Sequence, residues 1–89
     1  MNQFDVYMAG SCPIVIISPN VLNKHLNTVI IAPITQTIKG YPSRVLSQFG
    51  EVALDQIRTL DKSRLKEKQG RVDASTAANI KAILATMFS

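Results

Sequence analysis

The first part of the chain alternates short apolar runs with turn residues. Residues 4–8, 14–17 and 28–32 are short, rich in Val and Ile, and separated by Gly, Ser, Pro or Asn, which is typical of strands. The third run is apolar throughout after Thr28, so we expect it to be buried on both faces. Pro33 is expected to mark its end or a bulge, because proline cannot donate a hydrogen bond to a strand ladder.

Weaker signals follow in the middle of the chain. After a turn at 39–42, residues 43–46 are expected to form a short fourth strand, and residues 50–55 contain the start of a fifth. Residues 21–26 are expected to form one helical turn. Residues 59–70 show no clear period, so we predict a loop there with room for a turn of helix.

The end of the chain has a helical period instead. Asp73 offers an N-cap, and apolar residues then recur at the spacing of one helix face: Ile80, Ile83, Leu84, Met87 and Phe88. Several strands followed by one amphipathic helix indicate an α+β fold, in which the helix packs on a strongly curved, mostly antiparallel sheet.

Length and composition limit the class of protein. The 89 residues suffice for a single domain, 1–89, and 46% hydrophobic against 18% charged residues excludes a disordered chain. A domain this small has a thin stability margin, so a partner subunit is expected. The longest apolar run, 29–34, is six residues, whereas a membrane helix needs about 20, so no membrane span is expected. A single cysteine and the lack of a leader pattern favour the cytoplasm.

The charge distribution favours an anionic partner. Ten Lys and Arg against six Asp and Glu give a net charge of +4. Residues 58–71 hold six of the ten cations, which would strengthen binding to phosphate backbones or to an acidic peptide. A solvated basic loop on the surface is an equally good interpretation.

Several kinds of chemistry lack the residues that they need. Neither a GxGxxG nor a GxxxxGK[ST] pattern occurs, which disfavours a nucleotide cofactor. One Cys and one His cannot form a structural zinc site by themselves, and the acids are not clustered. His25 lies among polar residues and is expected at the surface, and Cys12 is expected to be a small apolar residue at the start of a buried strand. No metal or cofactor is therefore expected.

Cleavage of RNA without a metal remains possible, because the substrate supplies its own nucleophile, the 2′-OH. The protein has to align that group, stabilise the developing negative charge and move protons. Suitable groups follow two predicted strands: Thr35, Gln36 and Thr37, and then Asp55, Gln56, Arg58 and Thr59. By spacing alone, an ordinary polar turn at 35–37 and an ion pair between Asp55 and Arg58 are the more favoured interpretations.

Four blocks of the chain carry a more specific signal, and they appear in order: 15–20, 28–35, Tyr41-Pro42 and 52–65. The last, Val-Ala-Leu-Asp-Gln-Ile-Arg-Thr-Leu-Asp-Lys-Ser-Arg-Leu, is the most distinctive. Together they resemble the MazF/PemK family of toxin endoribonucleases from toxin–antitoxin systems. The resemblance extends over nearly the whole chain from Pro13.

This resemblance implies a small barrel-like sheet with a terminal helix, a homodimer, and metal-independent cleavage of single-stranded RNA through a 2′,3′-cyclic phosphate. It also implies inhibition by an antitoxin with an acidic segment. Thr35 and Asp55 fall on catalytic positions of the family. The residues expected to bind RNA or to lie at the interface are Gln36, Thr37, Lys39, Arg44, Gln56 and Arg58.

The chain departs from the family at its first hairpin. Residues 8–11 stand in place of a long loop, and Cys12 precedes Pro13 where the family has a catalytic Arg. Loss of that cation is expected to lower the cleavage rate by about 10²- to 10⁴-fold. The activity is therefore expected to be attenuated, unless another basic residue such as Arg58 substitutes.

Two other functions remain as alternatives. One is a catalytically inactive member that only binds an antitoxin. The other is a DNA gyrase poison like CcdB, which has the same fold, a similar N-terminal segment at 3–7 and a short first hairpin. Against the second, the chain ends Met87-Phe88-Ser89, which matches the C-terminus of those poisons poorly.

Overall fold

The computed structural model describes all 89 residues. Its elements are the seven strands and four helical segments β1 (Asp5–Ala9), β2 (Cys12–Ile16), α1 (Asn20–His25), β3 (Thr28–Thr35), β4 (Arg44–Ser47), β5 (Gly50–Ala53), η1 (Leu54–Gln56), β6 (Arg58–Asp61), η2 (Lys62–Arg64), β7 (Leu65–Arg71) and α2 (Ala74–Met87). The segments η1 and η2 are single turns of 3-10 helix.

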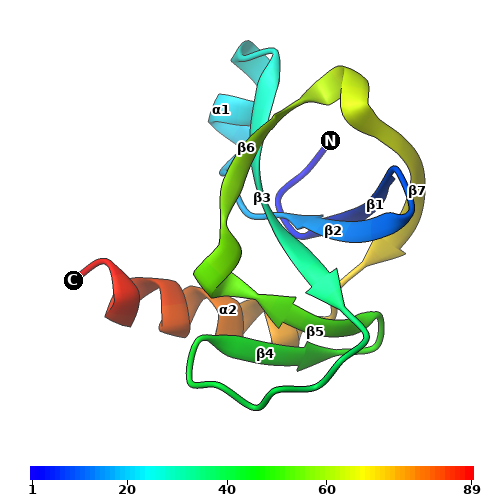
Figure 1. Ribbon diagram of the computed structural model, residues 1–89. Helices are drawn as coiled ribbons and strands as arrows, with labels where there is room; N and C mark the ends of the chain where they lie inside the picture. The colour runs from blue at the N-terminus through cyan, green and yellow to red at the C-terminus, as the bar shows by residue number, and fades with distance from the viewer.

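The strands form one curved antiparallel sheet in the order β4-β5-β3-β2-β1-β7, with β6 also paired to β3. In Figure 1 the chain arches from β6 to β7 and returns beside β1, while the β4–β5 hairpin lies next to α2. The predicted α+β architecture, a strongly curved antiparallel sheet with a C-terminal helix, is confirmed.

The central strand β3 is longer than the sequence suggests. It pairs with β2 as far as Pro33 and with β5 from Ile34 onward, so Pro33 marks a change of partner and the strand continues to Thr35. Neither the expected strand end nor the expected bulge is found at this proline, since no register shift interrupts the pairings of β3 there. The expectation that the strand is buried on both faces is also wrong in part, because Ile30 is 36% exposed.

The largest correction concerns residues 59–70, which are not a loop. They form β6, η2 and most of β7. Within β7 only Leu65 is buried, and the pairing of β7 with β1 shifts register twice. A mostly exposed and irregularly paired strand shows no alternation of apolar and polar residues, which explains why no period is visible there.

The sheet buries apolar side chains on both faces. On β2, Val15 belongs to a cluster that packs against Ile80 of α2, whereas Ile14 and Ile16 belong to a second cluster with Ile31. Successive side chains of a strand point to opposite faces, so this short strand contributes to both clusters. The second cluster lies on the face that also carries the candidate site described below.

Helix α2 begins as predicted and ends with uncovered apolar residues. The Asp73 carboxylate accepts a hydrogen bond from the Thr76 backbone N–H at 2.8 Å, which is an N-cap. Ile80 is fully buried, but Met87 is 39% and Phe88 73% exposed, so the predicted apolar face is buried only in its first part. Neither helix has the length and apolar character needed to cross a membrane.

Of the two candidate reactive side chains, His25 lies where the sequence predicts it and Cys12 does not. His25 is exposed, as expected. Cys12 is exposed as well, at the start of β2, so the expectation of a small apolar residue in a buried strand is wrong at this position. Burial on β2 begins only at Ile14.

Candidate functional site

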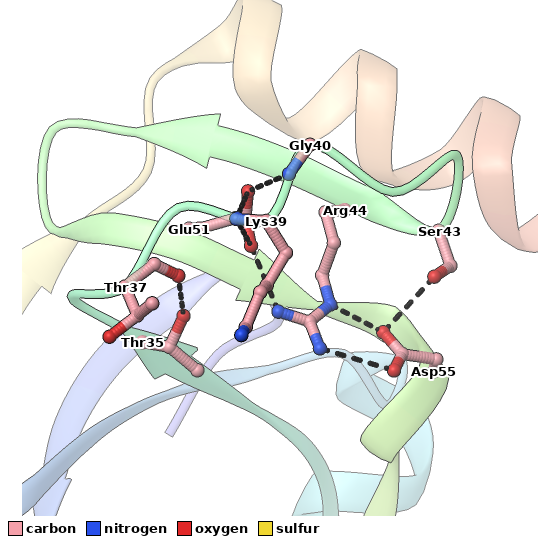
Figure 2. Close-up of polar contacts among 8 residues, drawn as sticks. All are labelled: Thr35, Thr37, Lys39, Gly40, Ser43, Arg44, Glu51 and Asp55. Carbon is pink, nitrogen blue, oxygen red and sulfur yellow. Dashed lines mark hydrogen bonds and ion pairs between the residues drawn. The ribbon is translucent and has the colours of Figure 1, made fainter.

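The end of β3 and the β4–β5 hairpin present several polar side chains on one face. Thr35 lies directly opposite Glu51, and Arg44 lies opposite Ala53. Directly opposed residues share a face of the sheet, as do residues two apart on one strand. Thr35, Glu51 and Arg44 therefore project from the same face, and Asp55 follows on η1 (Figure 2).

Glu51 is the centre of this group. Its side chain is 1% exposed and accepts hydrogen bonds from three donors: the backbone N–H of Lys39 at 3.1 Å, that of Gly40 at 3.0 Å, and Nη1 of Arg44 at 2.9 Å. The Gly40 N–H is the largest cause that holds the pKa of Glu51 below its ordinary value, followed by Lys39 and Arg44 against the opposing effect of burial. The ionised carboxylate therefore ties the loop after β3 to β5.

Arg44 connects Glu51 to Asp55. Its Nε and Nη2 donate to the two carboxylate oxygens of Asp55 at 2.6 and 3.3 Å, and its guanidinium lies 5.1 Å from the centre of the Tyr41 ring. The side chain is 6% exposed. Hydrogen bonding to Asp55 is the main cause that raises the pKa of Arg44. The positive charge of Arg44 is thus shared between two carboxylates.

Asp55 is held as an anion. Hydrogen bonding from Arg44 is the main cause that lowers its pKa, and Ser43 Oγ donates a further hydrogen bond to Oδ1 at 3.1 Å. The side chain is still 36% exposed. An ionised carboxylate can accept a proton or orient a neighbouring group, and it cannot serve as a proton donor.

Thr35 and Lys39 complete the face. The Thr35 hydroxyl donates to the Thr37 carbonyl oxygen at 2.9 Å, a contact at the surface. The ammonium group of Lys39 forms no ion pair. In Figure 2 the side chain of Lys39 extends toward the same side of the hairpin as Thr35 and the Arg44 guanidinium.

Gly50 permits the close approach of β5 to the end of β3. Its φ is +128°, and a Cβ there would lie 2.7 Å from the Thr35 carbonyl oxygen and 2.8 Å from Nε2 of Gln36. The Gln36 side chain in turn donates to the Phe49 carbonyl oxygen at 3.0 Å. The Gln36 side chain therefore links the end of β3 to the β4–β5 turn.

The structure gathers most of the predicted residues but not all of them. Thr35, Thr37, Lys39, Arg44 and Asp55 surround Glu51 (Figure 2). Two others lie apart from this group.

Gln56 is exposed at the end of η1, and its side chain makes no hydrogen bond within the protein. Arg58 lies on β6, opposite Ile31 of β3, and it lines a cleft that does not include Glu51 or Thr35. The ion pair weighed between Asp55 and Arg58 does not form, since Asp55 pairs with Arg44.

Sequence reasoning missed Glu51 and Ser43. The available signal for Glu51 was a charged residue inside an otherwise apolar segment, between Gly50 and Val52. Such a residue either faces solvent or has buried partners. Which partners it has depends on strand register and is not visible in the spacing.

Comparison with known proteins agrees with this geometry. Residues 2–88 match the family of PemK-like, MazF-like toxins of type II toxin–antitoxin systems. The chain is similar to the endoribonuclease MazF of Staphylococcus saprophyticus, with 39% identity over 76% of this chain and 74% of that protein. The corresponding values for the endoribonuclease MazF of Staphylococcus epidermidis are 40%, 76% and 74%.

Solved structures show the same fold. An endoribonuclease from a mycobacterial species superposes with a TM-score of 0.91 at 30% identity, covering 97% of this chain and 88% of that one. A MazE–MazF structure from Deinococcus radiodurans gives a TM-score of 0.84 at 26% identity, with 98% and 94% covered. The resemblance found in the sequence is confirmed, and the chain belongs to the PemK-like, MazF-like toxin family of type II toxin–antitoxin systems.

Proposed function

We propose that this protein is a toxin that cleaves single-stranded mRNA without a metal, by attack of a 2′-OH on the adjacent phosphate to give a 2′,3′-cyclic phosphate. The observation that carries the proposal is the shared face of Thr35, Lys39 and Asp55, built around the buried Glu51–Arg44 pair. Both Staphylococcus relatives are endoribonucleases by name.

The side chains on this face divide the chemistry among them. The Thr35 hydroxyl needs only to rotate away from the Thr37 carbonyl oxygen to donate to a phosphate oxygen. Asp55, held ionised by Arg44, accepts the proton of the 2′-OH as its oxygen bonds to phosphorus. The P–O5′ bond breaks in the same step, and the leaving 5′-oxygen takes a proton from solvent. Lys39 supplies positive charge that no carboxylate neutralises.

Arg44 acts as a positioning residue in this proposal. Because its guanidinium is shared between Glu51 and Asp55 and its side chain is 6% exposed, it has little charge left to offer a phosphate. Its role is to fix the orientation of Asp55.

Two features support a low intrinsic rate. Position 12, where family members carry an Arg, is an exposed Cys next to a tight turn at Gly10 and Ser11. The lowered pKa of Asp55 also makes its carboxylate a weaker base. The rate is therefore proposed to lie about 10²- to 10⁴-fold below that of relatives with the arginine.

The proposed partners are an acidic antitoxin segment and a second copy of the chain, and the proposed location is the cytoplasm, where mRNA is found. The net charge of +4 favours an acidic ligand. A mycobacterial endoribonuclease in complex with its cognate antitoxin superposes on this chain with a TM-score of 0.91 at 30% identity. The exposed Phe88 and Ile30 favour burial against another subunit.

The test is cleavage of defined single-stranded RNA in EDTA by the wild type, Thr35→Ala and Asp55→Ala. Cleavage by the wild type is expected, with a loss of roughly 10²-fold or more in each variant. Activity equal to that of the wild type in both variants would overturn the proposed site.

A second candidate function is antitoxin binding without cleavage, and the cysteine at position 12 is the observation that favours it. Tight binding of an acidic antitoxin peptide by a wild type that leaves RNA intact even at high enzyme concentration would support this function. Stalled gyrase–DNA complexes in a parallel assay would support a gyrase poison instead.

A further inference from the structure

The cations of residues 58–71 have different surroundings in the folded protein. Lys68 and Arg71 lie 3.4 and 3.6 Å from the carboxylate oxygens of Asp5, which is 2% exposed. Lys62 donates to the backbone carbonyl oxygen of Asn23. These three cations have partners within the fold. The side chains of Arg58, Arg64 and Lys66 form neither an ion pair nor a hydrogen bond.

The three unpaired cations line one cleft of about 340 Å³, together with Ser63 and the turn at Gly10. Gly10 has nothing within 4 Å of the position that a Cβ would take, so the short β1–β2 turn leaves the cleft open. The acidic neighbours in sequence, Asp61 and Glu67, form no ion pair with any of the three cations.

The cleft lies on the same face of the sheet as Thr35. Arg58 is directly opposite Ile31 on β3, so the two side chains share a face. Ile31, Pro33 and Thr35 alternate along β3 and therefore point to that face too. The four residue steps from Ile31 to Thr35 span roughly 13 Å of extended strand.

The chemistry of the cleft fits a phosphodiester. Two guanidinium groups offer paired N–H donors that match phosphate oxygens, and an ammonium and a hydroxyl add further donors. Because roughly 13 Å of strand separates Ile31, the partner of Arg58, from Thr35, we assign the cleft to a different phosphate of the same RNA strand from the one that contacts Thr35.

We infer that Arg58, Arg64 and Lys66 form a second phosphate-binding site, which holds the RNA backbone at a nucleotide away from the scissile bond. This inference rests on the proposed function. In this arrangement the cleft binds the RNA backbone, and the face around Thr35 carries out the cleavage.

The test uses the full chain and an RNA that cannot be cleaved, with a 2′-deoxynucleotide at the scissile position. Affinity is measured from low to moderate salt for the wild type, Arg64→Gln and Lys66→Gln, with Lys24→Gln of α1 as the matched control, since Lys24 is exposed and forms no ion pair. Each cleft variant is expected to bind several-fold more weakly and to flatten the slope of log K against log salt by about 0.7. The control is expected to match the wild type.

A second arm locates the phosphate. Neutral methylphosphonates replace single phosphates at successive positions of the RNA. At one position, distant from the scissile bond, the methylphosphonate is expected to weaken wild-type binding several-fold. The same methylphosphonate is expected to have no added effect on binding by Arg64→Gln. Circular dichroism melting checks that both variants fold.

Several results would overturn the cleft as a phosphate site. Wild-type RNA affinity and salt slope in both variants would do so, as would a methylphosphonate effect that persists undiminished in Arg64→Gln. Loss of binding to a polyglutamate peptide with unchanged RNA binding would assign the cleft to an acidic protein ligand instead. Failure of the proposed function has a different signature, since it appears in the cleavage assay as intact RNA or as cleavage that is independent of Thr35.

Discussion

Glu51 is a fully buried carboxylate whose three hydrogen-bond donors come from a loop and a neighbouring strand. Replacing it with Gln removes the charge opposite Arg44 and turns an amide N–H toward backbone donors. We expect Glu51→Gln to lower the melting temperature by several degrees and to reduce RNA cleavage, because one of the two acceptor oxygens becomes an amide NH2 that cannot accept. Thermal melting and the cleavage assay measure this, with the exposed Glu67→Gln as a control that leaves both unchanged.

The carboxyl groups also predict how stability depends on pH. The pKa values of Glu51, Asp55 and Asp73 lie below their ordinary values of 4.5, 3.8 and 3.8. A lowered folded-state pKa contributes stability above the unfolded value, and this stability is lost as pH falls through the folded value. The urea midpoint is therefore expected to be flat from pH 7 to about pH 5 and to fall below about pH 4.5.

The same titration has an internal control in Glu51→Gln. Its decline below pH 4.5 is expected to be shallower than that of the wild type, because one of the linked carboxyl groups is gone. An equal decline in both proteins would show that Glu51 is not one of the groups responsible.

Position 12 offers a gain of function. Cys12→Arg restores the cation that the family carries before Pro13, on an exposed position of β2. If charge stabilisation limits the reaction, the single-turnover rate of RNA cleavage is expected to rise by about 10²-fold or more. Cys12→Gln serves as the uncharged control, and an equal rate in both variants would exclude the missing charge as the cause of a low rate.

At the scale of elements, the junction of β3 and β5 depends on the glycine at position 50. Gly50→Ala would force a side chain onto a φ of +128° and to within 2.7 Å of the Thr35 carbonyl oxygen. We expect a loss of at least roughly 1–3 kcal/mol of unfolding free energy, measured by urea denaturation, together with reduced cleavage. The comparison is Gly10→Ala, where nothing lies within 4 Å and a smaller loss is expected.

The elements differ in how far the sequence predicts them. The strands before residue 55 are predicted by short apolar runs between turn residues, and helix α2 by its helical period and N-cap, because each of these elements buries apolar side chains. β7 does not, since Leu65 is its one buried residue and its partner strand shifts register. The local pattern of apolar residues indicates which side chains are buried. A mostly exposed strand is defined by its pairing with neighbouring strands, which this pattern does not show.

The candidate site shows the same division. Thr35 and Asp55 were expected from their places at strand ends and from the family motif. The ion pair of Asp55 with Arg44 was not expected, because it depends on Arg44 lying opposite Ala53. Residues eleven positions apart meet here through a hairpin register, and no spacing in the sequence predicts that contact.

At the scale of the whole molecule, the buried core is expected to stabilise the single subunit, and the uncovered end of α2 is expected to contribute to association of two subunits. Ile80→Ala empties a fully buried position and is expected to cost about 2–5 kcal/mol. Phe88→Ala changes a side chain that is 73% exposed, so it is expected to leave the stability of the single subunit nearly unchanged and to weaken the proposed homodimer. Urea denaturation and sedimentation equilibrium separate the two effects, and a Phe88→Ala dimer as tight as the wild type would exclude this end of α2 from the interface.

The most direct test of the function of the whole molecule is the chemical nature of the RNA ends formed in EDTA. Mass spectrometry of the products is expected to find 2′,3′-cyclic phosphates with the wild type, and these products are expected to fall by roughly 10²-fold or more with Thr35→Ala. Products that carry 3′-hydroxyl ends, or cyclic phosphates formed equally by Thr35→Ala, would contradict cleavage at the face of Thr35 and Asp55.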